Sequence, residues 1–137
     1  MKLVSACLAG INCKYNGSSK PKEKIIEMVK NGEAIPVCPE QLGGLTTPRE
    51  TAEQKNERVF TKDGKDVTTE FVKGANEGLK IAILAGCKEA ILKARSPSCG
   101  SGKVYDGSFS GKLIDGDGVF AALLKKNGIR ILTEEEI

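Results

Sequence analysis

The sequence contains no histidine among its 137 residues. This absence excludes Ser-His-Asp and Cys-His nucleophile systems within one chain, and it excludes zinc sites of the HExxH type. Proton transfer must therefore come from Glu, Asp, Lys, Tyr, Ser or Cys, or from a metal. Any metal site must be built from thiolate and oxygen ligands.

Aromatic residues, long apolar runs and an excess of charge are also scarce. Aromatic residues make up 4% of the chain and tryptophan is absent, so surfaces that stack nucleic-acid bases are poorly supplied. The formal net charge of +3 is small, and we expect no nucleic-acid partner. No segment is long and apolar enough for a signal peptide or a membrane span, so we expect no membrane association. Five cysteines, an odd number, indicate a cytoplasmic protein with reduced thiols rather than a disulfide framework.

Apolar runs alternate with helical patterns along the chain. Helices are expected from Pro21 to Gly32, over 68–84, and from Asp117, as the capping residue, to Lys126. The expected strands lie at 2–6, 34–38, 89–94 and 129–132. This order predicts one α/β domain over 1–137, with a mainly parallel, four-stranded Rossmann-like (flavodoxin-like) sheet flanked by helices.

Two small hairpins are expected as insertions in this sheet architecture. Asp-Gly pairs favour tight hairpin turns, and they place one hairpin over 58–67, around Asp63-Gly64, and a second near Asp106-Gly107. The segment 39–58 is expected to be irregular and, because of its length, functional.

Three cysteines, Cys7, Cys38 and Cys99, come just after short apolar runs, where strands are expected to end. The carboxyl ends of parallel strands lie along one edge of a sheet, so these thiols are expected to meet there. Structural zinc ribbons use paired CxxC spacings, and none occurs in this sequence. An iron–sulfur cluster on three thiolates is therefore favoured over zinc. One iron left open can bind a substrate as a Lewis acid.

The other two cysteines differ from these three in their surroundings. Cys87 lies between a helix and a strand, and we expect it in the core. Cys13 follows Cys7 by six residues in the same loop, and it is open to three interpretations: a fourth ligand, a redox partner or a structural thiol.

Two groups of polar residues accompany the cysteines. After Cys38, Glu40 is a candidate proton carrier and Arg49 is a candidate to bind a carbonyl or an anion of the substrate. The alternative for Arg49 is a surface ion pair with Glu50 or Glu53.

Before Cys99, the hydroxyls of Ser96 and Ser98 are candidates to bind the substrate or to hydrogen-bond cluster sulfurs. The alternative for both serines is a local cap of the turn.

The segments CLAGINCKYNG, CPEQLGGLTTPRE and LKARSPSCGSG resemble, in order and spacing, a bacterial family once known only as a domain of unknown function, which includes the TudS-like thiouracil desulfurases. The resemblance implies an oxygen-labile [4Fe-4S] cluster on Cys7, Cys38 and Cys99. It also implies non-redox removal of sulfur from a thiolated pyrimidine base, which gives the oxo base and hydrogen sulfide. A serine and a glutamate assist in the family, and the matching residues are Ser96 and Glu40.

Two other classes of function stay open from the sequence. One is a non-catalytic iron–sulfur or sulfur-handling protein, and the other is a thiol redox protein that uses Cys7 and Cys13. The sequence also leaves open the natural thio-substrate and whether the chain forms an oligomer.

Overall fold

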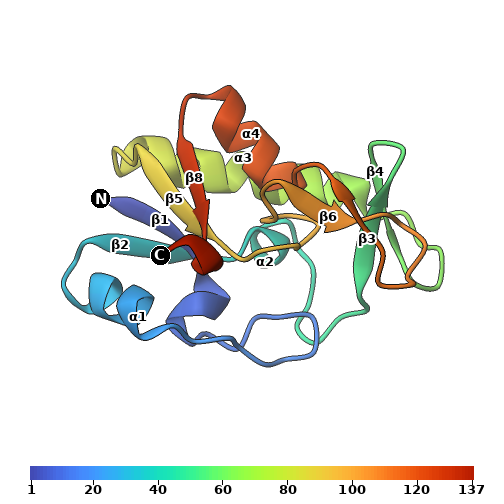
Figure 1. Ribbon diagram of the computed structural model, residues 1–137, viewed down its shortest axis with the longest axis horizontal. Coiled ribbons are helices and arrows are strands. Elements are labelled where there is room, and N and C mark those ends of the chain that lie inside the picture. The colour runs from blue at the N-terminus through green and yellow to red at the C-terminus, as the bar shows by residue number, and fades with distance from the viewer.

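The centre of the fold is a four-stranded parallel sheet, and the computed structural model describes all 137 residues around it (Figure 1). The strands are β1 (Lys2–Ser5), β2 (Ala34–Val37), β5 (Glu89–Leu92) and β8 (Arg130–Thr133). They lie in the order β2-β1-β5-β8, and every neighbouring pair is parallel. The predicted α/β class and its four-stranded parallel sheet are confirmed.

Helices cover both faces of this sheet (Figure 1). One face carries α3 (Thr68–Leu84) and α4 (Val119–Lys126), and the other carries α1 (Glu23–Lys30) and the short 3₁₀ helix η1 (Ala6–Ala9). A second 3₁₀ turn, η2 (Glu134–Glu136), follows β8. Successive side chains of a strand point to opposite faces. Leu3 accordingly joins the core that contains Phe120, whereas Val4 joins the core that contains Ile25.

The strand order creates a crevice at the carboxyl edge of the sheet. β2 lies on one side of β1, whereas β5 and β8 lie on the other side. Loops that leave β1 and β5 therefore diverge, and such a switch point is where open α/β sheets bind ligands. Cys7 follows β1, Cys38 follows β2, and the loop after β5 contains Cys99.

The two hairpins lie beside this edge (Figure 1). β6 (Lys103–Tyr105) and β7 (Leu113–Asp115) pair in antiparallel fashion around the Asp106-Gly107 turn, as predicted. The chain turns back at Asp63-Gly64 as predicted, but the regular pairing of β4 (Arg58–Thr61) is with β3 (Ala52–Lys55), through a turn that was not predicted. Asn56 and Glu57 form that turn with φ of 53° and 65°, so it has the left-handed backbone of a tight hairpin without a glycine. The Asp63-Gly64 turn returns the chain antiparallel to β4, with a bridge between Phe60 and Asp66 and backbone hydrogen bonds from Thr61 to Lys65 and from Val67 to Val59.

The segment 39–58 is more regular than its sequence indicated. Besides β3 it contains the short helix α2 (Pro39–Leu42), which directly follows Cys38. α2 packs on α3 with almost no space between the backbones. A Cβ added to Gly43 would lie 1.9 Å from the carbonyl oxygen of Glu70. Only glycine fits at this contact, so the close approach of the two backbones fixes the position of α2 and of its residues relative to α3.

The expectation that Asp117 caps the last helix was wrong. α4 begins after Gly118 and has no side-chain cap. The Asp117 carboxylate instead accepts a hydrogen bond from the backbone N–H of Gly102 at 2.9 Å and pairs with Lys125 at 2.8 Å. Asp117 thus joins the loop after β5 to α4.

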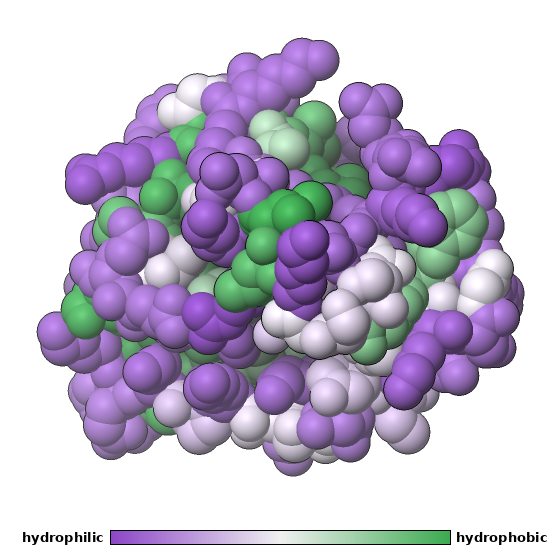
Figure 2. Space-filling view, turned by 45° about the vertical axis from the view of Figure 1, so that its right-hand side comes forward, coloured by the Kyte–Doolittle hydropathy of each residue, from purple (hydrophilic) through white to green (hydrophobic).

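Hydrophilic side chains predominate on the face drawn in Figure 2, and hydrophobic residues are visible there only in limited patches. The most exposed large hydrophobic side chains of the whole chain are Ile83 and Leu84, at the end of α3. None of the helices combines the length and the apolar character needed to cross a bilayer.

Candidate functional site

A cavity of about 900 Å³ lies at the carboxyl edge of the sheet, where the loops after β1, β2 and β5 meet the two hairpins. Its volume is within the ~300–1,000 Å³ typical of small-molecule sites. The predicted site residues that line it are Cys7, Cys38, Cys99, Glu40, Arg49 and Ser96. Residues from three distant motifs thus share one cavity.

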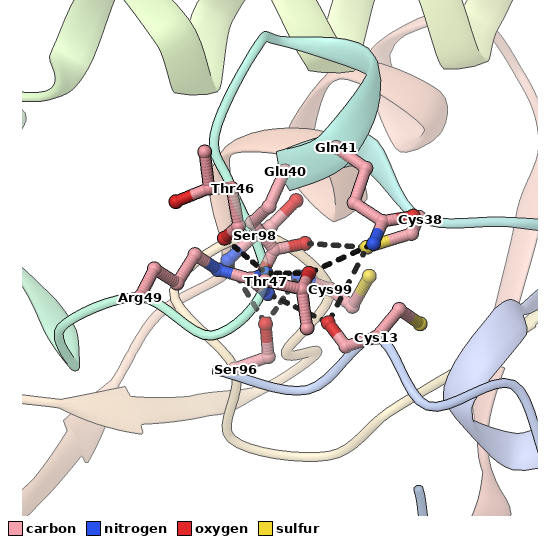
Figure 3. Close-up of polar contacts among 10 residues, drawn as sticks. All are labelled: Cys13, Cys38, Glu40, Gln41, Thr46, Thr47, Arg49, Ser96, Ser98 and Cys99. Atoms are coloured by element: carbon pink, nitrogen blue, oxygen red, sulfur yellow. Dashed lines mark hydrogen bonds and ion pairs between the residues drawn. The ribbon is translucent and has the colours of Figure 1, made fainter. Parts of the chain in front are cut away.

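The cysteines of the cavity wall are buried or partly buried, and each is a free thiol. Cys7 lies in η1, and Cys38 is the residue that precedes the first turn of α2. Figure 3 shows Cys38 and Cys99 pointing into the same region, with Cys13 beside them. Cys13 also lines the cavity. Cys87 does not line it and packs instead in the core beneath α3 and α4, as predicted.

The three strand-end thiols influence one another electrostatically. Burial raises the pKa of Cys7 to about 11, with a smaller effect from Glu40 and a still smaller one from Cys38. Burial also raises the pKa of Cys99 well above its ordinary value, and Glu40, Cys7 and Cys38 add to the rise. A hydrogen bond with Cys13 and then burial raise the pKa of Cys38. Since thiols must lose their protons to bind a metal, a metal bound here has to compensate for the raised pKa values of these cysteines.

No group of three Cys, Asp or Glu side chains is close enough to hold one ion. A tetrahedral zinc site needs its ligand atoms within about 2.3 Å of one metal. A cluster has several irons and takes its thiolates at different atoms, so its cysteines lie farther apart. Three thiols around one cavity, without histidine, fit the donor set of an iron–sulfur cluster.

Glu40 and Arg49 form an ion pair inside the wall of the cavity (Figure 3). Arg49 Nη2 lies 3.6 Å from Glu40 Oε2 and donates to the carbonyl oxygen of Cys13 at 2.9 Å. Arg49 Nη1 donates to Thr47 Oγ1 at 3.0 Å and to the Thr46 carbonyl at 3.3 Å. The other oxygen of Glu40, Oε1, lies 3.8 Å from the Cys38 sulfur. Burial raises the pKa of Glu40, and the charge of Arg49 opposes that rise.

Sequence reasoning did not find this pair, because it considered only Glu50 and Glu53 as partners of Arg49. Those two residues are near Arg49 in sequence, whereas Glu40 becomes its neighbour only when the loop from 43 to 48 folds back. The two glycines and the one proline of that loop, Gly43, Gly44 and Pro48, were the features of the sequence that indicated such a turn.

Ser96 organises the loop that carries Cys99. Its Oγ accepts hydrogen bonds from the backbone N–H of Ser98 at 3.1 Å and of Cys99 at 3.0 Å. A hydroxyl has two acceptor lone pairs and one hydrogen. With both lone pairs engaged, Ser96 retains its O–H hydrogen for a ligand in the cavity.

Ser98 is placed differently from Ser96. Its side chain is fully buried, its Oγ has no hydrogen-bond partner, and it does not line the cavity. The structure therefore brings Ser96, but not Ser98, to the cavity surface.

Several residues of the cavity wall were not identified from the sequence. Ser5, at the end of β1, accepts a hydrogen bond from the backbone N–H of Lys93 at 2.9 Å, and it lowers the pKa of Cys99 against the larger effect of burial. Lys93 follows β5 and forms a largely buried ion pair with Glu134 at 3.2 Å. Both residues lie at the carboxyl ends of strands, as Cys7, Cys38 and Cys99 do, so their positions in the sequence were the signal for them.

Comparison with known proteins gives three matches. A family model described as 2-thiouracil desulfurase matches residues 3–136. The uncharacterized protein YbbK of Bacillus subtilis (strain 168) is 46% identical over 147 aligned residues, which cover 100% of this chain and 97% of YbbK. Among solved structures, the [4Fe-4S]-dependent thiouracil desulfidase TudS (DUF523Vcz) superposes with a TM-score of 0.94 at 42% identity. That match covers 98% of this chain and 91% of TudS.

Proposed function

Because the chain belongs to the 2-thiouracil desulfurase family, we propose that it is a [4Fe-4S]-dependent enzyme that removes sulfur from a thiolated pyrimidine base. The substrate class is that of 2-thiouracil, and the products are the oxo base and hydrogen sulfide. The observation that carries this proposal is the meeting of Cys7, Cys38 and Cys99 at one cavity, from three separate strand ends. The family resemblance drawn from the sequence, with its enzyme class and its cofactor, is confirmed by the comparisons.

Cys7, Cys38 and Cys99 would hold the cluster, with Cys13 left outside the ligand set. When bound, the cluster supplies a Lewis-acidic iron with an open position for the substrate sulfur. The overall change is a hydrolysis, in which water replaces sulfur on the ring carbon and the sulfur leaves as hydrogen sulfide. No electron is gained or lost in this balance, so the reaction needs no oxidant or reductant.

Glu40 is the residue proposed to move the proton. Its carboxylate lies in the cavity wall beside Cys38. Burial raises its pKa, and a more basic carboxylate is better suited to accept a proton from water. Oε1 accepts the proton when water attacks the ring carbon, and it returns the proton to the departing sulfur. Arg49 holds the other oxygen, so Oε1, which lies beside Cys38, is the oxygen proposed to react.

Ser96 is proposed as a hydrogen-bond donor to the substrate. Both of its lone pairs are occupied by backbone N–H groups, so it can offer the substrate only its O–H hydrogen. The developing negative charge on the ring or on the sulfur is the acceptor that such a donor stabilises.

Arg49 and Ser98 were expected to bind the substrate. The terminal nitrogens of Arg49 bind the protein itself, and we propose that its main role is to hold Glu40. Binding of the substrate by Arg49 or by Ser98 stays a prediction, as do the cytoplasmic location and the oligomeric state.

The test is anaerobic reconstitution of the purified chain with iron and sulfide, followed by incubation with 2-thiouracil in H₂¹⁸O. We expect a three-cysteine [4Fe-4S] cluster, release of one sulfide per uracil, and one ¹⁸O atom in each uracil formed. A loaded cluster with no turnover of any thiolated base would make the chain a non-catalytic iron–sulfur protein. Failure to bind iron, together with reversible oxidation of Cys7 and Cys13, would make it a thiol redox protein.

A further inference from the structure

Phe109 has a backbone conformation that large side chains rarely adopt. Its φ is +57°, in the left-handed region. Residues other than glycine with positive φ are uncommon, and for a bulky side chain such a conformation is a genuine outlier. Strain of this kind persists only where the surroundings enforce it, and it concentrates at ligand-binding positions. Phe109 is half-buried and lines the cavity that contains the cysteines.

A buried carboxylate enforces the conformation of the loop that carries Phe109. Glu53, on β3, is only 8% exposed, and its Oε1 accepts the backbone N–H of Gly107 at 3.0 Å and of Phe109 at 3.1 Å. The same loop lies against the backbone of β3, because a Cβ added to Gly107 would be 2.7 Å from the carbonyl oxygen of Gln54. β6 also lies beside β3 (Figure 1). The loop is thus fixed to the neighbouring hairpin at two points.

The aromatic residues of this chain gather around the cavity although they are few. Both tyrosines and two of the four phenylalanines line it. Phe71 is buried in the small core under β4, and Tyr15 is 46% exposed. Phe109 is partly accessible, and its backbone N–H is held by Glu53. A ring held in this way can offer one face to a ligand.

From these observations we propose that Phe109 is a stacking surface for the planar ring of the substrate and that Glu53 is the positioning residue that holds it there. This inference rests on the proposed function, because it assumes a thiolated pyrimidine in the cavity. Stacking on an aromatic side chain tolerates many bases, since every base has a π-face. The enzyme should therefore prefer cyclic, planar thioamides to open-chain ones, whatever the ring substituents.

The experiment compares 2-thiouracil with thiourea, which has the same N–C(=S)–N unit but no ring. In the loaded enzyme we expect Phe109→Ala to raise KM for 2-thiouracil by about tenfold, in line with the loss of one base–aromatic stack. We expect kcat, cluster content and activity on thiourea to change little. Phe60→Ala is the matched control, because Phe60 is a half-buried phenylalanine of β4 that does not line the cavity.

Glu53 is tested through the same KM. Glu53→Gln retains an oxygen that can accept both N–H groups and should keep KM near the wild-type value. Glu53→Ala removes the acceptor and should raise KM as Phe109→Ala does, with cluster content unchanged.

A binding measurement separates this inference from the proposed function. The chain has no tryptophan, so Phe109→Trp introduces a single tryptophan, whose fluorescence can be read without turnover. We expect uracil and 2-thiouracil to quench the fluorescence of Phe109→Trp in the cluster-loaded protein and to leave that of Phe60→Trp unchanged.

Equal KM in Phe109→Ala and wild type, or no quenching of Phe109→Trp, would overturn the stacking role while desulfuration itself continued. Absence of desulfuration in the wild type, with quenching present, would overturn the proposed function but keep the binding surface.

Discussion

The guanidinium of Arg49 joins two of the cysteine motifs, because its Nη2 lies 2.9 Å from the carbonyl oxygen of Cys13 and 3.6 Å from Oε2 of Glu40. Both side chains of the ion pair are largely buried, with 11% of Arg49 and 14% of Glu40 exposed. The backbone N–H of Arg49 also donates to the Tyr15 carbonyl at 2.7 Å. Arg49 therefore fixes the loop after β1 and the carboxylate after β2 relative to each other.

We predict that Glu40→Gln lowers kcat by about 10²-fold or more, the usual effect of removing a general acid or base. Glutamine has the same shape and can still face Arg49, so iron and sulfide content should stay at the wild-type level. The measurement is single-turnover desulfuration of 2-thiouracil, with iron and sulfide assayed on the same sample.

Glu27→Gln is the matched control, because Glu27 is exposed on α1, away from the cavity. Wild-type turnover by a fully loaded Glu40→Gln enzyme would show that Glu40 is structural. The proton carrier would then lie elsewhere in the cavity wall.

Removal of any strand-end cysteine is expected to abolish the cluster. In each of Cys7→Ala, Cys38→Ala and Cys99→Ala, one iron of the cluster would lose its only protein ligand. We expect each variant to lose the visible absorption of the cluster and to fall well below the wild-type iron content. Cys87→Ala changes a buried cysteine outside the cavity and should load normally. Wild-type iron and sulfide in any of the first three variants would remove that residue from the ligand set.

Cys13 tests whether one iron is left open for the substrate. A fourth cysteine ligand would occupy the position that the substrate sulfur needs. Cys13→Ala should therefore retain the cluster and part of the activity, although Cys13 is buried and its loss leaves a small cavity. Spectroscopy that showed four cysteine ligands in the resting enzyme would contradict this prediction and favour an electron-transfer or structural cluster.

Sequence reasoning was most successful where local patterns coincide with the tertiary structure. The apolar runs at 2–6, 34–38 and 89–94 are short and bounded by turn residues, which favours buried strands, and the strand-end rule then placed Cys7, Cys38 and Cys99 at one edge. α3 was predicted with its observed bounds, because its apolar spacing and Gly86 agree.

The errors came from contacts between distant segments. The Asn56-Glu57 turn carries no glycine signal, so the β3–β4 pairing was not predicted, whereas the Asp63-Gly64 turn was. The partner of Arg49 and the strained conformation of Phe109 depend on how loops fold back on one another. A residue pattern along the chain does not say which loops come close to one another in space.

Ser96 is expected to act both in the loop and on the substrate. Ser96→Ala removes the acceptor for the N–H groups of Ser98 and Cys99 and the O–H donor to the cavity. Ser96→Thr keeps both functions. We expect Ser96→Ala to bind the cluster but turn over roughly tenfold or more slowly, by analogy with loss of a preorganised donor, and Ser96→Thr to recover most of the rate. Equal rates in Ser96→Ala and wild type would leave Ser96 with only its local role as a cap.

The close contact between α2 and α3 is expected to depend on Gly74. A Cβ added to Gly74 would lie 1.8 Å from the carbonyl oxygen of Pro39, so Gly74→Ala must push α2 away from α3. Overpacking of this kind costs about 1–3 kcal/mol, which exceeds the ~1 kcal/mol that alanine gains over glycine within a helix. Thermal unfolding of the cluster-free protein should show a Tm lower by several degrees, whereas Lys73→Ala, at the exposed neighbouring position, should change Tm little. Because α2 carries Glu40 and follows Cys38, Gly74→Ala should also lower kcat at temperatures where the protein is fully folded. A Gly74→Ala protein with wild-type Tm and wild-type kcat would mean that this helix contact does not position the site.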